Sequence, residues 1–191
     1  MKTLLIIIFS FFNYFSFSQS ILTDLQNDNH RKIITSAWEG NLPSQEYQID
    51  TDEDLFVQLS CISIPNFKNE YFLTFHLFDT FNLGCLQENI SKTKILFTDN
   101  SVIELMQCSS QSCNPNQYSA TYCMFSQKEI ANPVSKNDIS IQNINKLHNN
   151  PIENITIYGT EGYHDYKIRQ KKDSILIKHF LMISEQLIKK H

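Results

Sequence analysis

Glycine is scarce in this chain, with four residues in 191. Glycine-rich phosphate loops need this residue at fixed spacing, and neither G-x-x-x-x-G-K-[ST] nor G-x-G-x-x-G occurs. The sequence therefore excludes the loops by which the common nucleotide-binding proteins hold phosphate. Asparagine, with eighteen residues, is expected to form many of the turns instead, because it tolerates the left-handed backbone conformation better than most residues.

Several catalytic signatures are also absent. The sequence contains no G-x-S-x-G nucleophile turn and no H-E-x-x-H zinc-binding helix. No cofactor and no metal is predicted. Basic residues do not dominate, since 16 Lys and Arg stand against 20 Asp and Glu for a formal charge of −4. This balance argues against nucleic acid as a partner, and the sequence identifies no other partner.

Long apolar runs are missing outside the N-terminus, which reads MKTLLIIIFSFFNYFSFSQ. Lys2 precedes an apolar run too short to span a bilayer comfortably, and Ser16 and Ser18 have the spacing of a signal peptidase site. We therefore predict a signal peptide over residues 1–18 and a single exported domain over residues 19–191. The mature chain is expected to lack a transmembrane segment and to be periplasmic or secreted.

Alternating apolar residues predict several strands. The stretch DLFVQLSCISI (54–64) alternates, YFLTFHLF (71–78) is apolar on both parities, and YSATYCMF (118–125) is rich in β-forming residues. In KILFTDNSVIEL, two such runs flank Asp99 and Asn100, which predicts a tight hairpin. Together these segments predict an antiparallel β-meander sheet. A later strand is predicted over residues 152–159 (IENITIYG).

Two segments have helical periodicity. A short helix is predicted in SIQNINKL, with Ser140 as a possible N-cap and a stop at Asn149-Asn150-Pro151. The C-terminal segment DSILIKHFLMISEQLIKKH predicts an amphipathic helix. Its apolar stripe comprises Leu176, Phe180, Ile183 and Leu187, widened by Ile177, Leu181 and Ile188. The expected fold class is α+β, with both helices packed on the sheet.

Five cysteines lie in the part expected to be exported: Cys61, Cys85, Cys108, Cys113 and Cys123. In CSSQSC the spacing is C-x₄-C, which fits neither a thioredoxin-like C-x-x-C centre nor the short-spaced pairs of common zinc sites. A disulfide is the favoured interpretation, with unpaired thiols as the alternative. Cys85 can pair with Cys108 or Cys113, or Cys108 and Cys113 can pair with each other.

The stretch YGTEGYHDY is the best candidate for a functional segment. His164 and Asp165 could serve as acid and base or as two metal ligands, with Glu161 nearby. The alternative is a polar turn between two strands. Adjacent side chains on an extended segment point to opposite faces, which weakens the case for a joint site.

The order of several short motifs resembles a pattern in uncharacterised small exported proteins of Gram-negative bacteria. These motifs are "GCL", the hairpin KILFTDNSVIEL, a cysteine-bearing loop, a helix ending in "NKL", and NPIENITIYG, over about Asn82 to Ile183. Asn100 stands where that pattern has glycine, and Thr156 or Tyr158 replaces its arginine. The resemblance implies an exported protein of this fold and carries no catalytic residue.

Taken together, these features predict an exported protein that is a non-enzymatic binding or structural module. The alternative is a hydrolase or metal-dependent enzyme that uses the segment Tyr158–Tyr166. A pocket in which His164 and Asp165 converge with another acid or histidine would favour the enzyme. Side chains that diverge on a convex turn would count against it.

Overall fold

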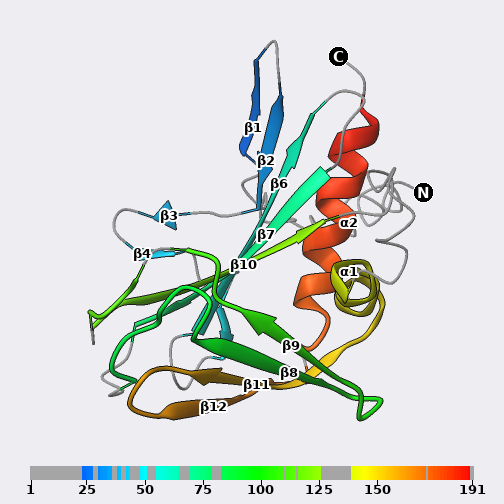
Figure 1. The fold of residues 1–191 in the computed structure, drawn as a ribbon. Helices are drawn as coiled ribbons and strands as arrows, with labels where there is room; N and C mark the ends of the chain where they lie inside the picture. The colour runs from blue at the N-terminus through cyan, green and yellow to red at the C-terminus, as the bar shows by residue number, and fades with distance from the viewer. Residues whose placement is uncertain are drawn as a thin grey trace, which may run out of the picture.

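The chain folds into two main antiparallel sheets and two helices (Figure 1), and its fold class is α+β, as the sequence predicts. The computed structural model describes residues 23–27, 30–35, 38–39, 42–43, 48–50, 55–64, 69–78, 83–109, 111–114, 116–125, 139–170 and 172–189. The signal peptide predicted over residues 1–18 lies outside these ranges. Neither described helix is long and apolar enough to cross a membrane.

The first sheet has six strands in the order β1-β2-β6-β7-β10, with β5 beside β6. Every pairing is antiparallel. Leu55, Val57, Leu59 and Cys61 all point into the core, so the parity predicted for this strand is confirmed. The strands are β1 (Thr23–Gln26), β2 (Arg31–Ile34), β5 (Gln48–Asp50), β6 (Leu55–Ser63), β7 (Asn69–Leu77) and β10 (Tyr118–Phe125).

The second sheet has four antiparallel strands in the order β12-β11-β8-β9. The predicted hairpin joins β8 to β9. Asn100 adopts a positive φ of 63° in its turn, and the Ser101 N–H donates to Asp99 Oδ1 at 2.9 Å. The strands are β8 (Lys92–Phe97), β9 (Val102–Met106), β11 (Ile152–Tyr158) and β12 (Tyr163–Lys167); the short strands β3 (Trp38–Glu39) and β4 (Leu42–Pro43) pair with each other.

The strand connections differ in one respect from the predicted meander. The β8–β9 hairpin leaves the first sheet and becomes half of the second, while β10 returns to pair with β7. Both sheets turn apolar side chains toward one common core. Across that core Thr93 of β8 and Tyr122 of β10 are joined by a hydrogen bond between their hydroxyl groups. The two-sheet arrangement therefore buries the apolar side chains of more strands than a single flat meander would.

Helices α1 (Ile139–Asn149) and α2 (Ile175–Ile188) pack against the first sheet, with α2 beside β6 and β2 and α1 beside β10 (Figure 1). The ring of Phe180 lies 5.5 Å from that of Tyr71. The predicted stripe is confirmed, since Leu176, Phe180 and Ile183 are buried and Leu187 is partly buried. Its predicted widening is wrong for Leu181 and Ile188, which are exposed.

A polar contact ties the end of α2 to the β1–β2 hairpin. Arg31 donates two hydrogen bonds to the carboxylate of Asp24, at 2.9 and 2.6 Å, and Gln186 donates a third at 2.7 Å. These contacts fix the C-terminal helix at the outer edge of the first sheet. The buried stripe of α2 thereby covers part of the inner face of the first sheet.

Candidate functional site

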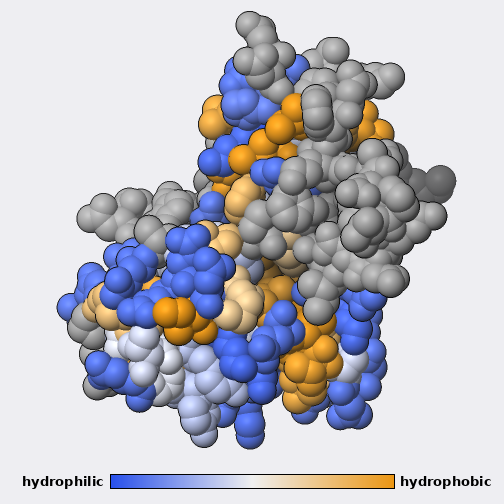
Figure 2. All heavy atoms as spheres, in the orientation of Figure 1, coloured by the Kyte–Doolittle hydropathy of each residue, from blue (hydrophilic) through white to orange (hydrophobic). Residues whose placement is uncertain are grey.

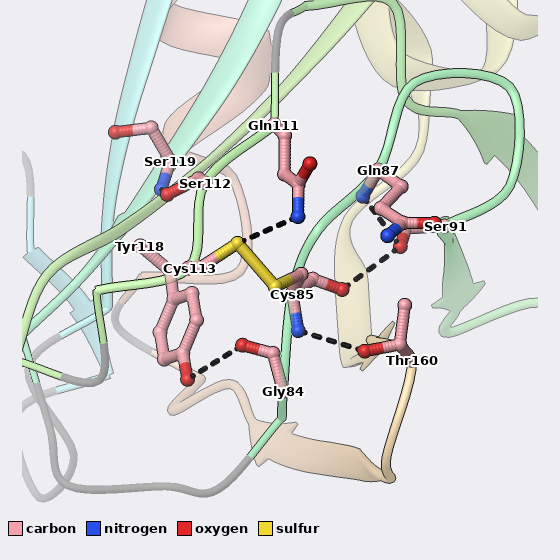
Figure 3. The surroundings of a disulfide bond; sticks show 10 residues. All are labelled: Gly84, Cys85, Gln87, Ser91, Gln111, Ser112, Cys113, Tyr118, Ser119 and Thr160. Atoms are coloured by element: carbon pink, nitrogen blue, oxygen red, sulfur yellow. Dashed lines mark hydrogen bonds between the residues drawn. A yellow bond between two sulfur atoms is a disulfide. The ribbon is translucent and has the colours of Figure 1, made fainter.

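Cys85 and Cys113 form a disulfide (Figure 3). This is one of the three pairings left open by the sequence. Cys113 is exposed, and Gln111 Nε2 donates to its sulfur at 2.8 Å. Cys108, the third candidate, lies outside this disulfide, and its N–H donates to Thr121 O of β10 at 2.8 Å. The bridge suits an oxidising compartment.

The loop that carries Cys85 is bound closely to the turn between β11 and β12. Thr160 N–H donates to Cys85 O at 3.0 Å, and Cys85 N–H donates back to Thr160 Oγ1 at 2.8 Å. Glu161 N–H adds a third bond, to Leu83 O at 3.1 Å. Gly159 of the YGTEGYHDY segment is needed for this contact, since a Cβ at this position would collide with the Leu83 carbonyl. The turn is thereby fixed to the disulfide loop.

The candidate residues His164 and Asp165 point to opposite faces of β12. His164 is half-buried and its ring lies 4.7 Å from that of Tyr166, which is fully buried. Asp165 is exposed and accepts a hydrogen bond of 2.5 Å from Thr156 Oγ1 of the neighbouring strand. The two side chains diverge, as the alternation of an extended strand requires, so they share no site.

Glu161, the third candidate, lies exposed at the turn. Its backbone N–H bonds Leu83, so its described role is to hold the turn against the disulfide loop. Among the residues with described positions, no group of three or more His, Cys, Asp or Glu side chains lies close enough to hold a metal ion. His164 and Asp165 therefore do not form the joint site considered for them.

The outward face of the second sheet gathers a different set of side chains. Tyr158 of β11 lies opposite Tyr163 of β12 on one side and Lys92 of β8 on the other. The two tyrosine rings are 5.5 Å apart between centroids, tilted by 34°. The Nζ atoms of Lys92 and Lys94 lie 5.5 and 5.6 Å from the centroid of the Tyr158 ring. We call this surface, completed by Glu104, the tyrosine–lysine face.

Glu104 of β9 supplies a carboxylate that pairs with both lysines of this face. Its carboxylate lies 3.2 Å from Lys92 Nζ and 3.9 Å from Lys94 Nζ. Exposed ion pairs and cation–π contacts are each worth at most about 1 kcal/mol. Their effect here is to orient the two ammonium groups above one ring rather than to stabilise the fold. Figure 2 shows hydrophilic and pale residues predominating in the region where Figure 1 places β8, β11 and β12.

Sequence reasoning missed this face. The parity of Lys92 and Lys94 in β8, and that of Tyr158 in β11, do indicate outward side chains. What brings them together is the register of β8 against β11, in which Lys92 stands opposite Tyr158. That register joins segments more than sixty residues apart, and local periodicity does not encode it.

Two histidines, His179 of α2 and His76 of β7, have shifted pKa values. Burial, together with the nearby charges of Lys172 and Lys178, lowers the pKa of His179 to about 3. Its Nδ1 lies 3.1 Å from Thr35 Oγ1. Burial also lowers the pKa of His76. Both imidazoles are therefore neutral at pH 7 in the folded chain.

His76 lies in a chain of side-chain hydrogen bonds across three strands. Its Nδ1 is 3.1 Å from Ser119 Oγ, and its Nε2 is 3.2 Å from Gln58 Oε1. A hydroxyl that is hydrogen-bonded to a neutral imidazole has the arrangement of a nucleophile and its general base. The Ser119 N–H, however, donates to Ser112 Oγ at 3.2 Å, so it is not directed at an incoming oxyanion. The arrangement therefore acts as a cross-strand tie.

No family model matches the chain, and no curated protein or solved structure shows significant similarity to it. The resemblance to small exported proteins of Gram-negative bacteria stays a prediction.

Proposed function

We propose that this chain is an exported, non-enzymatic binding protein that holds a polysaccharide chain on its tyrosine–lysine face. The observation that carries the proposal is the pair of tyrosine rings beside two oriented lysines on an outward sheet surface. Tyr163 is 63% exposed, so its ring is accessible to a ligand. The divergence of His164 and Asp165 supports a binding rather than a catalytic role.

The composition of the face favours a sugar polymer over a protein partner. The central row across the strands consists of Glu104, Lys94, Thr156 and Asp165, all polar. The core of a protein interface is instead depleted in Lys, Glu and Asp. Donors and acceptors beside an aromatic platform match a ligand with hydroxyl groups around apolar C–H faces.

The supporting structure beneath the face is rigid. The turn that joins Tyr158 to Tyr163 is held by three hydrogen bonds to the loop that carries Cys85, and this loop is closed by the Cys85–Cys113 disulfide. A fixed platform reduces the ordering cost of binding, which matters for a ligand held by few contacts. A disulfide-bonded platform also suits the exported location that the N-terminal segment predicts, whether periplasmic or secreted.

Isothermal titration calorimetry of the secreted protein with a soluble polyuronate and with a neutral glucan tests this function. Binding to at least one polymer is expected, with a loss of about tenfold or more in Tyr158→Ala/Tyr163→Ala, since each stacking contact is worth on the order of 1 kcal/mol. The matched control, Leu181→Ala/Ile188→Ala, removes exposed apolar side chains from α2 and should bind like the parent chain. Equal losses in both variants, or no binding to either polymer, would refute the proposal.

A further inference from the structure

We propose that the polysaccharide is acidic and that Lys92 and Lys94 bind its anionic groups. This inference rests on the proposed function and names the ligand class for the same face. The shared chemistry of the ligand is a carboxylate or sulfate substituent on a sugar chain. Neutral sugar polymers would then bind through the tyrosines alone, and more weakly.

The first argument is the local charge. Lys92 and Lys94 both contact Glu104, and Asp165 is a second carboxylate in the same row of the sheet. With exposed Lys167 of β12 counted, three ammonium groups stand against these two carboxylates, which leaves a surplus of one positive charge. The side chains of Lys92, Lys94 and Glu104 are 35–44% exposed, so an incoming group can reach them. The chain as a whole carries −4, which makes a positive spot at the aromatic platform a local departure from the overall charge.

The second argument is that the ammonium groups are held in place before any ligand arrives. Lys92 and Lys94 are alternate residues of β8, so both side chains leave the same side of the sheet. The Tyr158 ring attracts both, at 5.5 and 5.6 Å. Lysine normally loses much rotamer freedom on binding, and this restraint reduces that loss.

The third argument is the distribution of charge along the face, which suits a polymer rather than a single small anion. Lys167 of β12 is exposed, and the residues that alternate with it, Asp165 and Tyr163, face outward. It stands two strands from β8, so about 10 Å separates it from the β8 lysines in the direction across the strands. The nearest carboxylate in its strand, Asp165, already accepts a hydrogen bond from Thr156. Positive groups thus stand on two separate strands, β8 and β12, and a polymer with more than one anionic group can reach both.

The experiment compares three polymers: a polyuronate, the same polymer after reduction of its carboxyl groups to alcohols, and a sulfated neutral glucan. Binding to the full secreted chain is measured by calorimetry at two salt concentrations. We expect the reduced polymer to bind about tenfold more weakly than the polyuronate, and the difference to shrink at high salt. Tighter binding of the sulfated glucan than of the polyuronate would identify sulfate as the favoured anion; the reverse order would identify carboxylate.

Two variants make the charge argument specific. Lys92→Gln/Lys94→Gln should lose about tenfold in affinity for the polyuronate and little for the reduced polymer. Glu104→Gln should gain about threefold for the polyuronate only, because it removes the carboxylate that competes for the lysines. Lys178→Gln, on the exposed side of α2, is the matched control and should change neither.

The outcomes separate the two proposals. If the polyuronate and its reduced form bind equally and Glu104→Gln changes nothing, the acidic-ligand inference fails while the binding function stands. If no polymer binds, both fail. Sedimentation of the protein alone tests a further occupant of the face: a dimer that dissociates in Tyr158→Ala/Tyr163→Ala would show that a second copy covers it, and would also overturn the inference.

Discussion

In β6, a central strand of the first sheet, two side chains that point away from the core are shielded, whereas on the second sheet the outer face is open. Phe56 and Ser60, which alternate with core residues of β6, are only 7% and 8% exposed. Val102 and Met106, in the equivalent positions of β9, are 52% and 45% exposed. The same alternation of side chains therefore produces one sheet with shielded outward positions and one sheet whose outer face is exposed to solvent.

The difference has a chemical basis in the two sequences. The segment of β7, YFLTFHLF, places aromatic residues on both parities, as strands covered on both sides require. The outer parity of the second sheet is mostly polar but includes exposed Val102 and Met106, whereas its inner parity is mostly aliphatic with buried Thr93 and Tyr166 among the aliphatic residues. If this comparison holds, substitutions on the first sheet should mainly lower the free energy of unfolding, and substitutions on the outer face of the second sheet should mainly lower the affinity for the proposed ligand.

The largest expected effect comes from removing an inner aromatic of the first sheet. Phe75 is fully buried and packs against Tyr122, with ring centroids 6.1 Å apart. Phe75→Ala should lower the free energy of unfolding by about 3–5 kcal/mol, because it loses apolar burial and leaves a cavity. Tyr163→Ala, an aromatic of the second sheet's open face, should change it by less than about 0.5 kcal/mol. Urea denaturation of both variants measures the contrast, and similar losses would abolish it.

The disulfide should rank next. Cys85 and Cys113 are 28 residues apart. Cys85→Ser/Cys113→Ser should cost about 3–4 kcal/mol of unfolding free energy by the loop-entropy estimate. Because the loop is bound to the turn of the second sheet, hydrogen exchange should accelerate first at the Thr160 and Glu161 amides. Uniform acceleration across β6 and β7 would instead mean that the bridge supports both sheets equally.

A pH-dependent loss of stability is expected from the first sheet and its helix. Burial lowers the pKa of His179 to about 3, below its ordinary value of 6.5. As the pH falls below 6.5 the unfolded chain takes up this proton and the folded chain does not. The contribution of His179 is therefore complete above pH 6.5 and is lost progressively toward pH 3, by about 2 kcal/mol at pH 5.

Denaturant titrations between pH 7 and pH 4 measure this slope. His179→Gln removes the titrating group and should flatten the slope between pH 6.5 and pH 5, even if the variant is less stable at pH 7. His148, which is partly exposed on α1, provides the control substitution His148→Gln. An unchanged slope in His179→Gln would show that another group causes the acid sensitivity.

The sequence predicted the elements better than their partners. Period-two alternation located β6 and β11, runs of apolar and β-forming residues located β7 and β10, and helical periodicity located α2, because each pattern lies within one element. The pairing of β7 with β10 and the choice of Cys113 as the partner of Cys85 depend on contacts across long loops. The tyrosine–lysine face depends on register in the same way. His164 and Asp165 were candidates for a joint site because they are adjacent in sequence. Adjacent residues of a strand point to opposite faces, so the same adjacency separates their side chains.

The smallest effect is expected from a matched pair of threonines, one on each sheet. Thr35 is fully buried; its Oγ1 accepts from Leu59 N–H at 3.1 Å and lies 3.0 Å from Leu59 O and 3.1 Å from His179 Nδ1. Thr35→Val should cost about 1–3 kcal/mol, because it leaves buried polar groups without their partner. Thr156→Val removes only the bond to exposed Asp165 and should cost less than about 1 kcal/mol.

Valine has nearly the shape of threonine, so this pair isolates the hydroxyl group in each setting. Urea denaturation gives both values, and the same Thr156→Val protein can be titrated with the polyuronate. Since Thr156 restrains Asp165 on the tyrosine–lysine face, we expect a measurable change in affinity with little change in stability. The opposite pattern, a large loss of stability without a change in affinity, would mean that the second sheet is part of the supporting framework rather than the surface that the framework holds in place.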